Sequence, residues 1–215
     1  MNAKRSSGDD NGQPLGQADA GARTHVLRHP VNVDRLMRAI VVVAGFAELA
    51  YIIVNVSGMP VYIKVSARLD ERWIGAMAAT FLIVEGVLKS PCGLLGDHVG
   101  RKAMIMIGPL LSTFTAALTP LTHNPYLLLI LRTVDGIGAA ALWPAAFSLI
   151  GDHVPEERRS RAMGTFNIAY LLGVAVGPAI GGFANQFAHH QLHLTLARSK
   201  DASFYVASGL FGATA

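Results

Sequence analysis

Charged residues are scarce in this chain of 215 residues, and that scarcity argues against an ordinary soluble domain. Asp, Glu, Lys and Arg together make up 15% of the sequence, whereas a soluble domain carries about 25%. Hydrophobic residues make up 52%, and they gather in runs of the roughly 20 residues that a helix needs to cross a bilayer. The composition therefore predicts an integral membrane protein.

Signals of several other protein classes are also missing. With one cysteine, Cys92, the chain cannot form an intrachain disulfide. It has no GxxxxGK[ST] phosphate loop, no HExxH zinc motif and no plausible nucleophile–base pair, which disfavours an ATP-driven pump or an enzyme. We predict neither a catalytic residue nor a cofactor. The net charge of +4 is spread over separate short segments, which indicates loop bias and not a nucleic-acid site.

The chain divides into a polar tail and an apolar domain. Residues 1–36 lack the apolar centre of a cleavable signal peptide, so we predict a disordered tail there and a transmembrane domain over 37–215. The final apolar run is too short to cross a membrane comfortably, so we expect the sequence to be truncated within a sixth helix. The expected spans are about 38–61, 74–96, 103–122, 125–150 and 162–186, with a partial span at 203–215.

The distribution of positive charge predicts the orientation of the chain. Eleven Lys and Arg residues fall in the tail, in the loop between the second and third spans, and in the loop between the fourth and fifth spans. Five fall on the other side. Because cytoplasmic loops carry the excess of Lys and Arg, the N-terminus is predicted to be cytoplasmic.

The loop between the second and third spans, Gly93–Lys102, reads GLLGDHVGRK. It resembles the loop signature of the major facilitator superfamily of secondary transporters, although His98 replaces the usual arginine. Asp97 ends a helix, where the dipole disfavours an anion, so it needs nearby donors such as Arg101. We predict a conformational latch at Asp97, with a solvated loop acid as the alternative, and a topological role for Lys102. The matching positions are Gly93, Leu95, Asp97, Gly100, Arg101 and Lys102.

A second stretch, Arg132–Ala140, resembles the fourth-helix signature of the same superfamily. Asp135 stands where glutamine is usual, which adds a charge within the membrane. The small residues of this stretch should allow tight packing against neighbouring helices. The matching positions are Arg132, Gly136, Gly138, Ala139 and Ala140.

A third pattern in the fifth span resembles the motif of the proton-coupled exporters within the superfamily. Gly173 and Gly177 form a GxxxG face for close helix contact, and Pro178 should bend the helix. For the individual glycines, an ordinary helix-packing face is the alternative interpretation. The pattern consists of Gly164, Gly173, Gly177, Pro178, Gly181 and Gly182.

Together these resemblances imply an all-α, polytopic bundle with two inverted three-helix repeats, the first half of a transporter that normally has two halves. They favour proton-coupled export (antiport) of a small organic or drug-like molecule by alternating access, in a bacterial inner membrane. The alternatives are a symporter for uptake of a metabolite or sugar, and a non-transporting fragment or scaffold. The expected partners are the lipid bilayer, protons, a small-molecule substrate, and a C-terminal half or second copy of the chain, with no nucleic acid.

Three carboxylates are expected near the middle of the membrane. Glu48, Glu85 and Asp135 each lie about ten residues inside a span, or about 15 Å deep at a rise of 1.5 Å per residue. A charge at that depth costs at least about 2.5 kcal/mol, so these side chains should face the bundle interior or a watery cavity. Asp97 lies about 18 Å along the helix from Glu85, too far to contact the same substrate.

The three carboxylates differ in their local partners. Glu85 is one turn from Lys89, and Arg132 is one turn from Asp135, whereas Glu48 has no local partner. Burial without a partner favours the protonated form of a carboxyl group. We therefore hypothesise that Glu48 leads in binding the coupling proton or a cation, and that Arg132 tunes Glu48 or Asp135. The alternative is that all three are neutralised structural groups.

His189, His190 and His193 form an HHxxH pattern in the loop after the fifth span. Histidines four residues apart share a helical face and can bind a metal ion. No acidic residue lies nearby, so we predict a solvated loop and no metal site.

Overall fold

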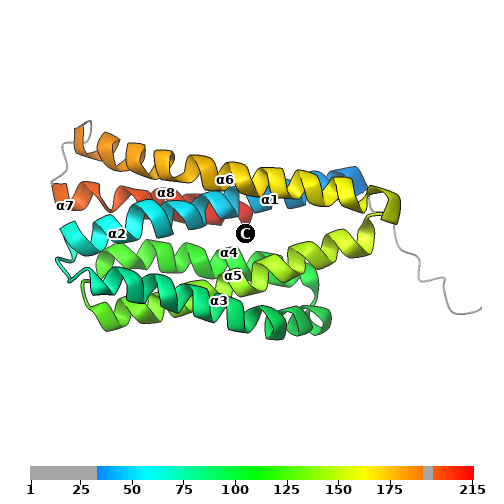
Figure 1. The fold of residues 1–215 in the computed structure, drawn as a ribbon, viewed down its shortest axis with the longest axis horizontal. Coiled ribbons are helices and arrows are strands. Elements are labelled where there is room, and N and C mark those ends of the chain that lie inside the picture. The colour runs from blue at the N-terminus through cyan, green and yellow to red at the C-terminus, as the bar shows by residue number, and fades with distance from the viewer. Residues whose placement is uncertain (1–32, 191–195) are drawn as a thin grey trace, which may run out of the picture. The chain divides into compact units, whose positions relative to one another are not determined.

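The computed structural model describes residues 33–190 and 196–215, and within these residues every regular element is a helix. Five helices are long and apolar enough to cross a membrane, which confirms the predicted polytopic helix bundle (Figure 1). The first, Val33–Ser66, consists of α1 (Val33–Ile52), the π-helical η1 (Ile53–Gly58), α2 (Met59–Val61) and the π-helical η2 (Tyr62–Ser66). The others are α3 (Arg72–Val99), α4 (Arg101–Leu118) with η3 (Thr119–Leu121), α5 (Pro125–His153) and α6 (Glu156–His190). Two short elements follow, α7 (Leu196–Ser199) and α8 (Ala202–Thr214).

The helices begin and end at residues with recognisable chemistry. α5 starts at Pro125, and the side chain of Asn124 accepts a hydrogen bond from the backbone amide of Tyr126, which is an N-cap. Gly100 alone separates α3 from α4 and adopts a φ of 103°, a conformation that strongly favours glycine.

The observed helices extend beyond several of the predicted spans. α6 begins at Glu156, ahead of the predicted 162, with Glu156 and Glu157 in its first turn, where acidic residues complement the helix dipole. α1 begins at Val33, so residues 33–36 are helical and not part of the predicted tail. Residues 1–32 of that tail lie outside the described residues.

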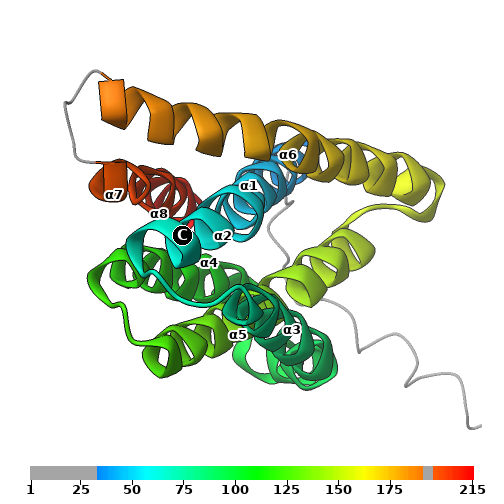
Figure 2. The ribbon, with the colours of Figure 1, turned by 60° about the vertical axis from the view of Figure 1, so that its left-hand side comes forward.

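The packing of the helices has the symmetry expected of two three-helix repeats. α1 packs against α6, and α3 packs against α5 (Figures 1 and 2). α4 packs against α5, α8 packs against α1, and α4 and α8 pack against each other. Exchanging the first three spans with the last three converts α1–α6 into α3–α5 and α4–α5 into α1–α8, and it leaves α4–α8 unchanged. This is the relation that repeats in transporters produce.

Glycines set the distance between α6 and the first span, both in α1 and in η1. A Cβ atom on Gly173 would lie 2.9 Å from the Leu49 backbone nitrogen, and one on Gly177 would lie 2.5 Å from Ile52 Cγ2. One on Gly181 would lie 2.6 Å from Ser57 Cβ. These distances are shorter than any ordinary carbon contact, so the two backbones can approach this closely only because the side chains are absent.

Other members of the fifth-span pattern lie elsewhere on α6. Among the described residues, a Cβ on Gly164 or Gly182 would meet no atom within 4 Å. Pro178 lies inside α6, and its carbonyl accepts a hydrogen bond from Ser57 Oγ at 3.1 Å. The pattern therefore combines a packing face with glycines that face open space in the described structure.

Candidate functional site

Glu48 and Glu85 both line a cavity of about 230 Å³ inside the bundle. Glu48 comes from α1 and is 5% exposed, while Glu85 comes from α3 and its side chain is 13% exposed. The lining also includes four aromatic side chains, Tyr51, Phe81, Trp143 and Tyr170. Two carboxyl groups that are distant in the sequence thus share one aromatic-walled space.

Glu48 has a partner that the sequence analysis missed. The Tyr170 hydroxyl, on α6, forms a hydrogen bond with the Glu48 carboxyl. The neighbouring glycine explains this proximity, since a Cβ on Gly173 would lie 3.2 Å from Glu48 Cβ. The position of Gly173, three residues after Tyr170 and so on the same helical face, was the available signal.

Glu85 forms the ion pair that its spacing predicted. Its Oε1 lies 2.8 Å from Lys89 Nζ, and the Lys89 side chain is 47% exposed. The charge on Glu85 is therefore balanced by a cation that lies toward the outside of the bundle.

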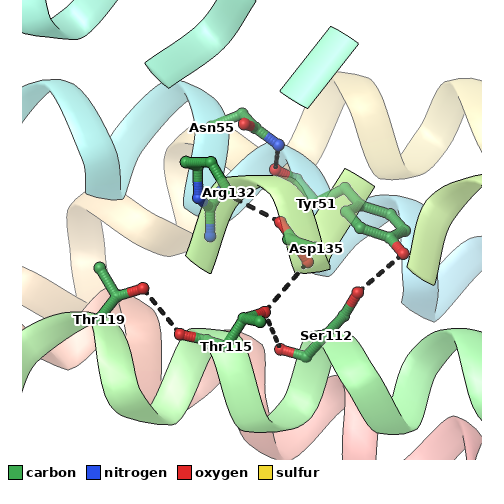
Figure 3. A network of polar contacts seen from close by, with 7 residues as sticks. All are labelled: Tyr51, Asn55, Ser112, Thr115, Thr119, Arg132 and Asp135. Atoms are coloured by element: carbon green, nitrogen blue, oxygen red, sulfur yellow. Dashed lines mark hydrogen bonds and ion pairs between the residues drawn. The ribbon is translucent and has the colours of Figure 1, made fainter. Parts of the chain in front are cut away.

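Asp135 lies in a separate polar network and is not part of the cavity lining. Its Oδ2 is 3.1 Å from Arg132 Nη1, and both side chains are about 1% exposed. The Thr115 hydroxyl donates to Asp135 Oδ1 at 3.3 Å (Figure 3). None of the three guanidinium nitrogens of Arg132 has a partner with hydrogen-bonding geometry among the described residues. Arg132 thus pairs with Asp135, and no described contact links it to Glu48.

Tyr51 stands between the cavity and this network. Its ring lines the cavity, and its hydroxyl forms a 2.9 Å hydrogen bond with Ser112 Oγ on α4. The Ser112 carbonyl in turn accepts a hydrogen bond from the Thr115 hydroxyl, the group that also reaches Asp135 (Figure 3). The sequence analysis missed this connection, although Tyr51 lies three residues after Glu48 and therefore on the same face of the helix.

The aromatic walls of the cavity contact one another. The Tyr51 ring lies 5.7 Å from Phe81 and 6.2 Å from Trp143, and Trp143 lies 5.6 Å from Tyr170, measured between ring centroids. Aromatic faces attract cations, most strongly where water is excluded. Carboxylates beside aromatic faces can therefore hold either a proton or an organic cation.

The residues of the predicted latch meet at the end of the bundle where α3 and α5 end and α4 and α6 begin (Figure 1). Arg101 pairs with Asp97 at 3.1 Å and donates to the Ser148 carbonyl of α5 at 2.8 Å. It also forms an ion pair with Asp152 of α5, a partner that the sequence analysis missed. Arg101 thus ties together the ends of three helices.

The remaining residues of the loop motif have simpler surroundings. A Cβ on Gly93 would meet Pro144 at an ordinary contact distance of 3.7 Å. Lys102 is exposed. Asp97 itself is 55% exposed at its side chain, so one face of this carboxylate is open to a further partner.

The predicted histidine cluster is only partly within the described residues. His189 and His190 end α6 with their rings 5.2 Å apart, whereas His193 lies outside the described residues. In the described part of the chain, no group of three His, Cys, Asp or Glu side chains is placed to hold a metal ion.

Comparison with known proteins identifies relatives of this chain. The family model described as Major Facilitator Superfamily matches residues 39–215. The quinolone resistance protein NorA of Staphylococcus aureus (strain N315) is 28% identical over 131 residues, which cover 61% of this chain and 34% of that protein. The probable L-galactonate transporter of Escherichia coli (strain K12) is 35% identical over 118 residues, which cover 55% of this chain and 26% of that protein. The matched region thus spans about a third of the first relative and about a quarter of the second.

Proposed function

Since this chain belongs to the Major Facilitator Superfamily, we propose that it forms one half of a secondary transporter that works by alternating access. In such transporters the substrate site lies between repeats near the middle of the membrane, and one half rocks against the other. A C-terminal half or a second copy of this chain would complete the pathway. We place the protein in a bacterial inner membrane with its N-terminus in the cytoplasm, as the Lys and Arg distribution favours.

We further propose that the transporter exports a small organic molecule in exchange for protons. The observation that carries this proposal is the shared cavity of Glu48 and Glu85 with its aromatic walls. A carboxylate inside a membrane protein must be neutralised, either by a proton or by a cation. Because one carboxylate cannot hold both at once, proton binding and cation binding compete, and that competition couples their movements in opposite directions.

The residues of the site have separate roles in this proposal. Glu48 carries the exchanged proton, and Tyr170 holds its carboxyl group in place. Glu85, already paired with Lys89, contributes negative charge to the same cavity. Arg132 and Asp135 form a second charged pair next to it, which Tyr51 and Ser112 link to the cavity wall. The fifth-helix pattern and the similarity to a quinolone resistance protein favour export over uptake.

The test is transport by the full chain in everted membrane vesicles, with ethidium as a fluorescent organic cation. A proton gradient should drive ethidium movement, and Glu48→Gln should reduce it at least tenfold and remove its dependence on pH. Glu71→Gln is the matched control, because Glu71 is an exposed acid paired with Lys64 outside the cavity. Transport by Glu48→Gln with an unchanged pH dependence would show that Glu48 is not the coupling residue.

The similarity to a probable L-galactonate transporter supports one competing function, uptake of a metabolite. The same vesicles distinguish the two functions, because uptake would move solute together with protons and export would move it against them. A chain that acts only as a membrane scaffold would give no gradient-dependent flux with any solute.

A further inference from the structure

A second and larger cavity, of about 670 Å³, lies where α1 and α6 begin. This is the end of the bundle that also holds Arg101, and it is the end predicted to be cytoplasmic. The charged part of the lining comes from Arg38, Arg158 and Arg161, with Asp34 as the one acidic side chain, and the Thr165 hydroxyl is also polar. The walls between them are apolar and include Val33, Met37 and Val154.

The arginines of this cavity are available to a ligand. All three are exposed, and among the described residues none of their guanidinium groups forms an ion pair. Within the described ranges, the guanidinium of Arg38 donates only to the Asp34 carbonyl, at 3.4 Å. The nearby Arg159 differs, because it pairs with Glu156 at 3.7 Å and donates to the Val154 carbonyl. With three cations and one anion, the cavity has an excess of positive charge.

An apolar groove of about 300 Å³ continues from this cavity along the same two helices. Val41 and Val42 line both spaces. From there the groove follows α1 as far as Leu49 and α6 as far as Val176, in the direction of the membrane interior. Its walls are open to the surroundings, since Val42 is 53% and Leu172 59% exposed. The groove has the position and polarity that an acyl chain requires.

We propose that this combined site binds an anionic phospholipid. The phosphate of the headgroup lies among Arg38, Arg158 and Arg161, and one acyl chain lies in the groove between α1 and α6. Basic pockets between membrane helices on the cytoplasmic side suit acidic headgroups, and guanidinium groups bind phosphate oxygens in a bidentate manner. A free phosphate would use the arginines and not the groove, and a neutral lipid would use the groove with no gain from the arginines.

The site also has a mechanical consequence. The arginines lie on α1 and on the first turns of α6, and these two helices pack closely deeper in the membrane through Gly173 and Gly177. A lipid that bridges their ends should hold α1 and α6 together at the surface. We therefore expect the lipid to raise thermal stability as well as to remain bound.

The experiment is native mass spectrometry of the full chain, delipidated in detergent and then mixed with dioleoyl phosphatidylglycerol or dioleoyl phosphatidylcholine. Wild type should retain phosphatidylglycerol at least tenfold better than phosphatidylcholine. The triple variant Arg38→Gln, Arg158→Gln, Arg161→Gln should lose that preference, whereas Arg72→Gln, at the other end of the bundle, should keep it. Leu172→Trp should fill the groove and weaken binding of the lipid, while Ile130→Trp, at an exposed site on α5, should not.

Melting temperature in the same detergent provides the second measurement. Phosphatidylglycerol should raise it by several degrees, and inorganic phosphate should not. Equal effects of phosphate and lipid would show a site for a free anion and overturn the proposal. Equal retention of phosphatidylglycerol by wild type and triple variant would also overturn it. A wild type without any lipid preference would overturn it as well. That result is expected if another transporter half or a second copy of the chain covers this face.

Discussion

At the scale of single residues, the buried charges of this protein differ in what neutralises them. Arg132 and Asp135 neutralise each other within one helix, and Lys89 neutralises Glu85 from the outside of the bundle. Among the described residues, no charged side chain is in direct contact with Glu48. Its one hydrogen-bonding partner in the described part of the chain is the Tyr170 hydroxyl. Because its charge is compensated least, we expect Glu48 to be the carboxyl group that most readily exchanges a bound proton for a cation.

The Arg132–Asp135 pair gives a prediction about stability. Asp135→Asn leaves a fully buried guanidinium without a counter-charge, which should lower the free energy of unfolding by about 3–5 kcal/mol. The double replacement Arg132→Met, Asp135→Leu removes both charges and should cost much less. Denaturation in detergent, followed by circular dichroism for Arg132→Met, Asp135→Leu and the double variant, measures the coupling. Effects of the two single changes that simply add would contradict a direct interaction.

Asp201, at the start of α8, gives a prediction about pH. Burial raises the pKa of its carboxyl group, and the favourable effects of His123, a hydrogen bond from Ser66 and Arg198 only partly offset this. A group whose pKa is raised by folding stabilises the folded state below its ordinary value of about 4, and this contribution is lost as the pH rises through the folded value.

The expected result is a stability that declines from about pH 4 upward, measured as the melting temperature in detergent. Asp201→Asn should make this part of the profile flatter, because the amide does not titrate. Asp70→Asn, at an exposed acid in the loop before α3, should leave it as in wild type. A variant profile that still declines with the wild-type slope would assign the effect to another group.

At the scale of helices, the sequence predicted where each span lies far better than what each residue contacts. Long apolar runs are sufficient to locate α1 and α3–α6, because a span is a property of consecutive residues. The contacts of Tyr170 with Glu48 and of Arg101 with Asp152 join helices that are distant in the sequence. Such contacts depend on how helices rotate and pack, and a single sequence does not encode that in any local pattern.

The interface between α6 and α1 gives a prediction about helix packing. Gly177→Ala places a Cβ atom 2.5 Å from Ile52 Cγ2, so the helices must separate or the side chain must move, which should cost about 1–3 kcal/mol. Gly182→Ala is the matched control from the same motif, since its Cβ would meet nothing within 4 Å in the described structure. Thermal unfolding in detergent compares them, and equal stability of the two variants would contradict the packing role.

At the scale of the whole molecule, the described helices present large apolar surfaces that no other described helix covers. α3 exposes Leu82, Ile83 and Val87, and α6 exposes Leu171 and Phe183. Lipid can cover such surfaces, and so can another half of a transporter. The half-exposed Asp97 beside Arg101 favours a second half, because a latch needs a surface on which to close.

This argument predicts that transport requires an assembly larger than one chain of this sequence. In detergent, light scattering should report a mass that corresponds to two chains or to this chain with a C-terminal half, and only that species should support proton-driven flux after reconstitution. Asp97→Asn should reduce flux several-fold, because it removes the carboxylate of the latch. The fold should stay intact, since an exposed ion pair contributes only about 0–1 kcal/mol to stability. Asp70→Asn serves as the control for an exposed acid outside the latch. A single chain that drives full flux as a monomer would show that this half moves solute without a partner, which rigid-body rocking of two halves does not allow.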